Sequence, residues 1–461
     1  MYKEQSCTST FMLGVREVDY LFSKKDLWKL CVPLVFEQAL AITVGMADTM
    51  MVSSVGEAAV SGVSLVDMIN MLIFSVLSAL ATGGAVVTSQ RIGAGKVDEA
   101  CKSAKQLLYT VLIGSTCIMV LVVLVRNPLL RLFFGSIEAD VMENALIYLL
   151  ISAVSYPFLA VYNACAALFR SMGNSQITLK VSVVMNVINI VGNAICIFVL
   201  HMGVAGVAIP SLVSRAVAGI ILYVLLQNPK HTVHFEKESF SLDWKVIKNI
   251  LYIGIPSGIE NGIFQLGRVL VVSIISGFGT VQIAANGVAN NLDALGCIIG
   301  QAMNLAMITV IGQCVGANDE RQIRYYTKRI LLMTYIPTII LNSCILLGLS
   351  PILRLYGLSA ETTDLAYKLV MIHDGCAMVL WPVAFVLPNM LRACNDVRFT
   401  MVVSIFSMFT FRIGFSYIIG VQMGMGAIGV WIAMVLDWIF RAALFIGRYL
   451  SGRWKKLCLV S

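Results

Sequence analysis

Apolar stretches of about 20 residues, separated by short polar breaks, recur along the whole chain. This is the length that an α-helix needs to cross the hydrocarbon core of a bilayer. The stretches are too long and too evenly apolar for barrel strands, which alternate between apolar and polar positions. They predict twelve transmembrane helices, at about residues 27–52, 58–89, 104–125, 144–169, 181–200, 204–227, 248–276, 280–311, 327–348, 365–391, 400–421 and 426–447.

The pattern also repeats within the chain at an offset of 223 residues. The segment P-x-x-x-E that begins at Pro33 recurs at Pro256, and "QRIGA" recurs as "QCVGA" at the same offset. Arg170 corresponds to Arg392 at an offset of 222, so one residue has slipped between them. Repeated halves are common in membrane transporters. Because each half contains an even number of helices, both halves have the same orientation, and a cleft between them is expected.

The repeat divides the chain into two pseudo-symmetric bundles with polar segments around them. We expect a cytoplasmic N-terminal segment at 1–26, a first six-helix half at 27–227, a cytoplasmic linker at 228–247, a second six-helix half at 248–447 and a cytoplasmic tail at 448–461.

Composition and charge agree with an all-α integral membrane protein. Of the 461 residues 59% are hydrophobic and 13% are charged, and the mean hydropathy is +0.86. The net charge of +8 would suit a nucleic-acid partner if it were clustered on one surface, but most Lys and Arg residues lie in the two terminal segments and in alternate connections. Such loops stay in the cytoplasm, so both termini are expected inside and no nucleic-acid partner is expected. Residues 1–26 show no apolar core of a cleavable signal peptide.

The first span contains two acidic residues, which are energetically costly inside a bilayer. Glu37 and Asp48 are eleven residues apart, close to three helical turns, so they share one helix face. An acid at the bilayer centre is kept where it faces protein or water. In the fifth span Asn189 and Asn193 are spaced i, i+4 and also share a face. We expect Asp48, Asn189 and Asn193 to form a cation-coupling site, with Glu37 in support. Asp48 is a possible sodium site. Structural roles remain alternatives. Each acid would then be held by hydroxyl groups or a basic partner, and the asparagines would hold neighbouring helices together.

The second half carries its own charges within spans. Asp437 and Arg441 are spaced i, i+4 and are expected to pair with each other. A possible polar site, read mainly as internal ion pairs around the two arginines, comprises Glu260, Arg268, Asp293, Asp374 and Arg412. His373 is expected to be a structural residue near the end of its span. The twelve cysteines show no CxxC pair or Cys/His cluster, so no metal site beyond the possible sodium site is predicted.

Nearly the whole chain, from about residue 24 to 448, resembles the multidrug and toxic compound extrusion (MATE) transporters. The resemblance rests on "MADTMMV" in the first span, "TSQRIGAG" with its echo "IGQCVGAND", "ALFRSMGNSQ", the asparagines of the fifth span and "MGVAGVAIPSLVSR". It implies two bundles around a V-shaped central cavity and export of organic, often cationic, compounds driven by protons or sodium ions. In the family, the acid of the "DT" pair belongs to a cation site, which carries over to Asp48. Sodium-coupled members place acids where Phe264 and Trp381 stand here, so coupling is expected to depend on the first half.

The expected function is therefore secondary active efflux by alternating access, in the plasma membrane of a bacterium, with no cofactor other than the coupling ion. A single chain is expected to suffice, with small organic compounds and the lipid bilayer as its partners. A lipid-linked saccharide flippase of the same superfamily is an alternative, disfavoured because the first half offers only Arg215 to a pyrophosphate group. A receptor or scaffold without transport is disfavoured by the repeat. An enzyme is not expected, because no nucleophile motif is found.

Overall fold

The computed structural model describes residues 20–135, 138–235 and 241–458. Parts of the expected N-terminal segment, linker and tail therefore lie outside the described residues. Helices account for nearly all of the described chain, and twelve of them are long and apolar enough to cross a membrane. The predicted all-α membrane fold with twelve spans is confirmed.

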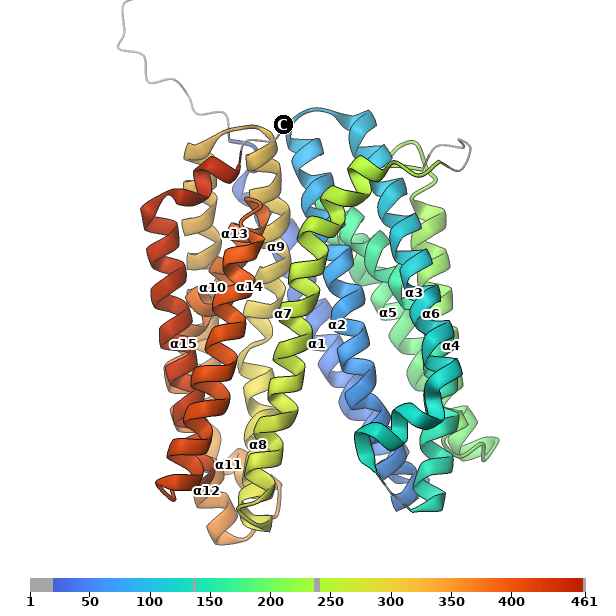
Figure 1. Ribbon diagram of the computed structural model, residues 1–461, viewed down its shortest axis with the longest axis vertical. Helices are drawn as coiled ribbons and strands as arrows, with labels where there is room; N and C mark the ends of the chain where they lie inside the picture. The colour runs from blue at the N-terminus through green and yellow to red at the C-terminus, as the bar shows by residue number, and fades with distance from the viewer. Residues whose placement is uncertain (1–19, 136–137, 236–240, 459–461) are drawn as a thin grey trace, which may run out of the picture.

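The first half consists of six long helices (Figure 1). They are α1 (Lys24–Ser53), α2 (Glu57–Gly93), α3 (Val97–Phe134), α4 (Ala139–Ser171), α5 (Ser175–Ala194), which continues as the π-helix η1 (Ile195–Val199), and α6 (Ala205–Leu225).

The helices of the second half are more often interrupted. They are α7 (Trp244–Ser276), α8 (Thr280–Gly296), α9 (Ile298–Gly316), α10 (Glu320–Leu347), α11 (Leu349–Leu355), α12 (Ala360–Trp381), the π-helix η2 (Pro382–Val386), α13 (Leu387–Ala393), α14 (Val397–Ser407), the π-helices η3 (Met408–Gly414) and η4 (Ser416–Gln422), α15 (Gly426–Ser451) and a 3-10 turn η5 (Arg453–Leu457).

One predicted span is not continuous. The stretch 280–311 was expected to be a single helix, but it is divided at Cys297 into α8 and α9, and α9 is the part that is long and apolar enough to span. Asn342 lies at this break and donates a hydrogen bond from Nδ2 to the carbonyl oxygen of Gly296 at 3.2 Å. An interruption of this kind is tolerated inside a membrane protein because neighbouring groups satisfy the freed backbone.

The two halves lie close together at one end of the molecule and their ribbons diverge toward the other (Figure 1). The start of α1, the linker segments and the C-terminal turn all lie at the closed end, which we call the linker end. There Tyr326 accepts a hydrogen bond from the backbone N–H of Phe22 at 2.8 Å, and Gln106 donates to the carbonyl oxygen of Ser241 at 2.7 Å. Between the halves, a pocket of about 370 Å³ is lined by Ser78, Thr82, Asn163 and Arg170 from one half and by Leu305 and Thr309 from the other.

At the linker end the repeated "Q-x-x-GA" segments of α2 and α9 contact each other directly. A methyl group added to Gly93 would overlap the carbonyl oxygen of Gln313, and one added to Gly316 would overlap that of Gln90. No side chain other than hydrogen fits there, so the two backbones approach as closely as glycine permits. The repeat therefore builds a symmetric contact in which each half supplies one glycine.

The glutamines of the same segments reach across the junction. Gln90 donates from Nε2 to the carbonyl oxygen of Ala393 at 2.9 Å, and Gln313 donates from Nε2 to the carbonyl oxygen of Ser171 at 2.7 Å. Each bond joins a residue of one half to the C-terminal turn of a helix in the other half. Such a bond satisfies a carbonyl that its own helix leaves free. The junction is therefore held by hydrogen bonds as well as by close packing.

We predict that Gly316→Ala lowers the midpoint of thermal unfolding of the purified protein. The added methyl group has no space, and overpacking of this kind costs about 1–3 kcal/mol. The matched control is Gly114→Ala in α3, where nothing lies within 4 Å of an added methyl group. Alanine favours a helix over glycine by about 1 kcal/mol, so the control is expected to keep or raise the midpoint. Equal midpoints for the two variants would show that the α2–α9 contact does not limit stability.

Candidate functional site

The structure brings three of the four residues predicted for the cation site together. Asn193 donates a hydrogen bond from Nδ2 to Oδ1 of Asp48 at 2.7 Å, and the same amide group lies 3.4 Å from Oδ1 of Asn189. Asn189 in turn donates from Nδ2 to Oγ of Ser211 at 2.9 Å. The cluster therefore joins α1, α5 and α6 in the first half.

Local structure explains how α5 presents these amides. Gly192 lies against Pro210 of α6, and a methyl group at Gly192 would come within 2.7 Å of the Pro210 Cβ. This close approach sets Asn189 and Asn193 against α6. The α-helix changes to the π-helix η1 directly after Ala194. π-helical turns are rare and often mark functional sites, because they shift side chains around the helix axis.

The cluster contains oxygens suited to a small cation. Asp48 is only half-buried, whereas Asn193 is fully buried and its Oδ1 has no hydrogen-bond partner among the residues that the structure describes. A buried amide oxygen without a partner is costly. The Asp48 carboxylate and the Asn189 amide oxygen are hard donors of the kind that sodium prefers, but Nδ2 of Asn193 lies between them, so its Oδ1 joins them only when that amide turns over. A proton on the Asp48 carboxylate would instead need no further ligand.

Sequence reasoning gave no role to two charged residues near this cluster. The charges of Arg215 and Asp67 act on Asp48. Arg215 donates from Nη1 to Oγ of Ser155 at 2.7 Å and lies over the ring of Phe74, 4.8 Å from its centroid.

Asp67 belongs to a short chain of hydrogen bonds. It accepts from Nδ2 of Asn70 at 3.3 Å, and Asn70 accepts from the hydroxyl of Tyr156 at 2.8 Å. A signal for Asp67 and Arg215 was present in the sequence, because both are charged residues inside apolar spans. Their proximity to Asp48 depends on how α2 and α6 pack and could not be read from spacing.

Glu37 lies apart from the cluster, nearer the linker end of α1. Its Oε1 pairs with Nη1 of Arg170 at 3.4 Å and its Oε2 accepts from the hydroxyl of Thr178 at 3.0 Å. In the second half Glu260 pairs with Arg392, with 2.7 Å between Oε1 and Nη2. Glu37 corresponds to Glu260 in the repeat, and Arg170 corresponds to Arg392. Each half therefore contains the same ion pair between its first and fourth spans, which we call the brace.

The expected pairing of charges in the second half is wrong in three respects. Glu260 pairs with Arg392 and not with Arg268 or Arg412. Asp293 and Asp374 both contact His373, whose Nε2 is 2.6 Å from Asp293 and whose Nδ1 is 2.8 Å from Asp374.

His373 is also deeper in its span than expected. It is 1% exposed, lies within α12 and packs edge-on against Trp438. With Cys297, which donates from Sγ to Asp293 at 3.2 Å, it forms a compact group around one carboxylate. Spacing along the chain does not show which helices bring these residues together.

The pairing of Asp437 with Arg441 is confirmed, with 2.9 Å between Oδ1 and Nε. Arg412 also approaches this carboxylate, at 3.7 Å from Oδ2, and Ser407 donates its hydroxyl to Oδ1. Phe264 lies beneath both guanidinium groups, 5.5 Å from that of Arg412 and 5.7 Å from that of Arg441.

Comparison with known proteins is consistent with this architecture. A family model described as MatE matches residues 33–195 and 256–418, two segments separated by the same offset as the internal repeat. The chain is 25% identical over 453 residues to the "Probable multidrug resistance protein NorM" of Thermotoga maritima, which covers 95% of this chain and 94% of that protein. It is 26% identical over 445 residues to the "Uncharacterized transporter YisQ" of Bacillus subtilis, covering 93% and 94%. A solved structure of a mutant of the Vibrio cholerae MATE transporter VcmN has a TM-score of 0.87 at 19% identity, with 95% of this chain and 98% of that chain covered, which shows the shared fold.

Proposed function

The chain belongs to the MatE family of membrane transporters, and we propose that it exports organic, often cationic, compounds from the cell in exchange for protons or sodium ions. As a member of this family it is a transporter and not an enzyme. Multidrug efflux is supported by two relatives that are named as probable multidrug resistance proteins, because each aligns with this chain along nearly its whole length. One chain contains both halves, so a monomer is expected to be sufficient.

The observation that carries the coupling proposal is the contact between Asp48 and Asn193. The carboxylate is held by one amide group, while the oxygen of that amide has no hydrogen-bond partner in the described part of the chain. A sodium ion would be bound by these oxygens and by that of Asn189 after the Asn193 amide turns its oxygen toward them, and a proton would be bound by the carboxylate alone. Either cation neutralises Asp48.

Neutralisation at this position can bias the two halves between conformations. A ligand shifts a conformational equilibrium only through its different affinity for the two states. An ionised Asp48 favours a conformation in which its charge is exposed to water or to a cationic compound, whereas a neutral Asp48 tolerates a closed, dry site. Cation entry therefore drives release of the exported compound and return of the transporter.

The proposed orientation places the linker end in the cytoplasm of a bacterium, with the protein in the plasma membrane. It is supported by the Lys and Arg residues of the two terminal segments and the linker, because positive loops stay inside. With this orientation, the contact between α2 and α9 closes the cytoplasmic side.

The orientation predicts the result of a topology experiment. A reporter fused after Ser461 and a second one inserted at residues 236–240 should both signal from the cytoplasm. One inserted after Gly135, between α3 and α4, should signal from outside. A reversed signal at any of these sites would contradict the proposed orientation.

The proposed coupling predicts that Asp48→Asn abolishes gradient-driven transport. We would reconstitute the protein in liposomes and measure uptake of a fluorescent organic cation under a proton gradient and, separately, under a sodium gradient. Asp48→Asn should fall to the rate of protein-free liposomes because the site is permanently neutral, and Asp48→Glu should keep part of the activity. Asn193→Ala should raise the cation concentration for half-maximal rate roughly tenfold, the effect of one hydrogen bond to a charged group.

The control is Asp140→Asn, at an exposed acid at the start of α4, which is expected to transport at the unaltered rate. The gradient that drives transport identifies the coupling ion. Wild-type rates in Asp48→Asn under both gradients would overturn the coupling proposal.

A further inference from the structure

Three side chains of the kinds that bind transition metals lie together in the second half, at the break between α8 and α9. They are Asp293 in the last turn of α8, Cys297 at the break itself and His373 in α12. The carboxylate oxygen, the thiol sulfur and the ring nitrogen that they offer lie within 4.8 Å of one another. The proposed coupling at Asp48 makes no use of this group.

The break in the helix determines where two of these side chains lie. Asp293 and Cys297 are spaced i, i+4 and share one face, and Sγ of Cys297 donates to Oδ1 of Asp293 at 3.2 Å. Asn342 holds the end of α8 through its hydrogen bond to the carbonyl oxygen of Gly296. His373 faces this pair from α12, which packs against α8. Because the group depends on packing between helices, the spacing of cysteines and histidines along the chain did not predict it.

The ring of His373 is oriented as in a metal-binding histidine. Its Nδ1 lies 2.8 Å from Oδ1 of Asp374, a fully buried carboxylate. A histidine that binds a metal usually donates its second ring N–H to a carboxylate or carbonyl oxygen, which fixes the ring and leaves the lone pair of the other nitrogen to the ion. Here the other nitrogen is Nε2, which lies 2.6 Å from Oδ1 of Asp293. The ring therefore presents its free nitrogen to the other two side chains.

A triad of charges without a metal explains this geometry less well. It would require a protonated His373 that donates from both ring nitrogens. Nε2 is buried and has no hydrogen-bond partner among the described residues, because Oδ1 of Asp293 is close to it but does not lie in the direction of a hydrogen bond. A buried polar atom without such a bond is costly. An ion bound to Nε2, to the carboxylate and to the thiolate would remove that cost.

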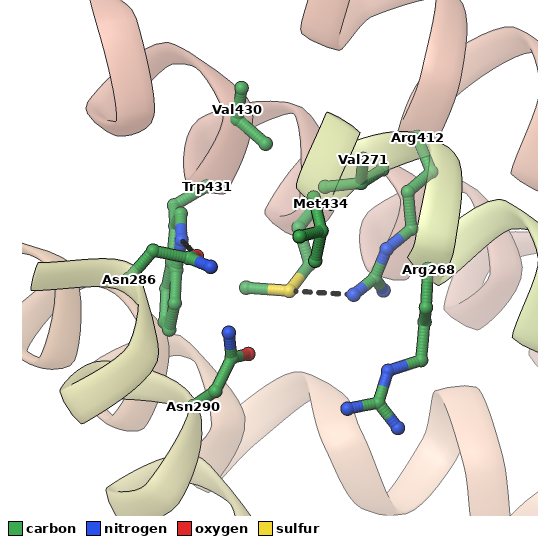
Figure 2. A pocket seen from close by; sticks show the side chains of 9 residues that line it. Arg268, Val271, Asn286, Asn290, Arg412, Val430, Trp431 and Met434 are labelled. Atoms are coloured by element: carbon green, nitrogen blue, oxygen red, sulfur yellow. Dashed lines mark hydrogen bonds between the residues drawn. The ribbon is translucent and has the colours of Figure 1, made fainter. Parts of the chain in front are cut away.

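An ion can reach the group from the side of Asp293. The Asp293 side chain is 24% exposed, whereas those of Cys297 and His373 are buried. Asn290, one turn before Asp293 on α8, lines the open pocket of Figure 2 together with Trp431. Trp431 also packs edge-on against the ring of His373, with 5.4 Å between the ring centroids. The pocket therefore leads to the exposed member of the group.

The surrounding charges match a divalent cation. Two carboxylates and a thiolate carry three negative charges when the ion is bound, and the ion leaves one of them unbalanced. The guanidinium group of Arg268, whose charge acts on Cys297, can balance it. Arg412 also acts on Asp293, but it lies 3.7 Å from Asp437 and is partly balanced there.

We propose that Asp293, Cys297 and His373 bind a divalent transition-metal ion, and that this ion is zinc. With bonds of about 2.0–2.3 Å, the ligand atoms of a tetrahedral zinc ion lie about 3.3–3.8 Å apart, so side-chain shifts of about 1 Å bring these three atoms to that spacing. A thiolate and an imidazole select zinc over sodium, magnesium and calcium, which prefer oxygen ligands. The bound ion joins the broken α8–α9 span to α12 and so fixes the second half.

The test is a metal titration of the full-length protein, purified in detergent with a tag that contains no histidine and stripped with a chelator. Cobalt(II) is the probe, because it occupies zinc sites and absorbs in the near ultraviolet when a thiolate binds it. We expect one cobalt ion per chain with this absorption, displaced by zinc but not by an excess of sodium or magnesium. Zinc should also raise the midpoint of thermal unfolding, because it binds the folded state.

Variants separate this group from other thiols. Asp293→Asn and His373→Gln keep the Cys297 thiol, and each should weaken cobalt binding at least tenfold. Asp374→Asn keeps all three ligands but loses the carboxylate that orients His373, and it should weaken binding about 10–100-fold. The matched control is Cys344→Ser, at an exposed cysteine of α10, which should bind cobalt as the unaltered protein does.

Two results would overturn the proposal. One is the absence of the thiolate absorption from the unaltered protein. The other is an unchanged affinity in Asp293→Asn, which would assign the absorption to thiols outside the group. Asp293 is the partly exposed ligand, so this variant decides the matter even if the buried change His373→Gln prevents folding. Binding is measured without a gradient or an exported compound, so the result does not depend on the proposed efflux function.

Discussion

The arrangement of the two halves depends on the close approach of α2 to the second half, to α9 at Gly93 and Gly316 and to α7 at Gly83. Glycine at these positions lets the backbones touch, and the cross-bonds of Gln90 and Gln313 attach each half to the other. A junction at one end of two long bundles leaves their opposite ends free to diverge (Figure 1). The two hydrophobic cores also cross the junction, because Leu30 and Leu34 of α1 pack with the second half and Ile250 and Ile253 of α7 pack with the first.

The buried charges of the two halves are arranged partly alike and partly differently. Both halves use the same brace of glutamate and arginine near the junction, at Glu37 and at Glu260. Further from the junction they differ. The first half holds the Asp48 carboxylate with the Asn193 amide group, whose oxygen is left without a partner in the described part of the chain. The second half places two arginines, Arg268 and Arg412, beside asparagines and Trp431.

The sequence predicted those features that depend on one helix or on the repeat. Hydrophobic length predicted the twelve spans, and the i, i+4 spacing predicted that Asn189 and Asn193 face the same way. The break at Cys297 was missed because the stretch 280–311 was treated as one apolar run, and hydropathy does not report helix continuity. Its first part is in fact interrupted by polar residues, namely Gln282, Asn286, Asn290, Asn291 and Asp293. The pairing of acids with arginines was wrong because partners on different helices are selected by packing. The repeat did hold a signal for two ion pairs, Glu37–Arg170 and Glu260–Arg392, since Glu37 recurs as Glu260 and Arg170 recurs as Arg392.

Distances between the halves test the central claim, that cation binding at Asp48 moves the junction between two states. Spin labels introduced as non-natural amino acids at Asp98 and Arg321 report the linker end, and labels at Ser53 and Ser276 report the opposite end; each pair is related by the repeat. Adding the coupling cation should lengthen the 98–321 distance and shorten the 53–276 distance in a fraction of the molecules, and Asp48→Asn should not respond. Distances that stay fixed, that change in the same sense at both ends, or that respond equally in Asp48→Asn would contradict it.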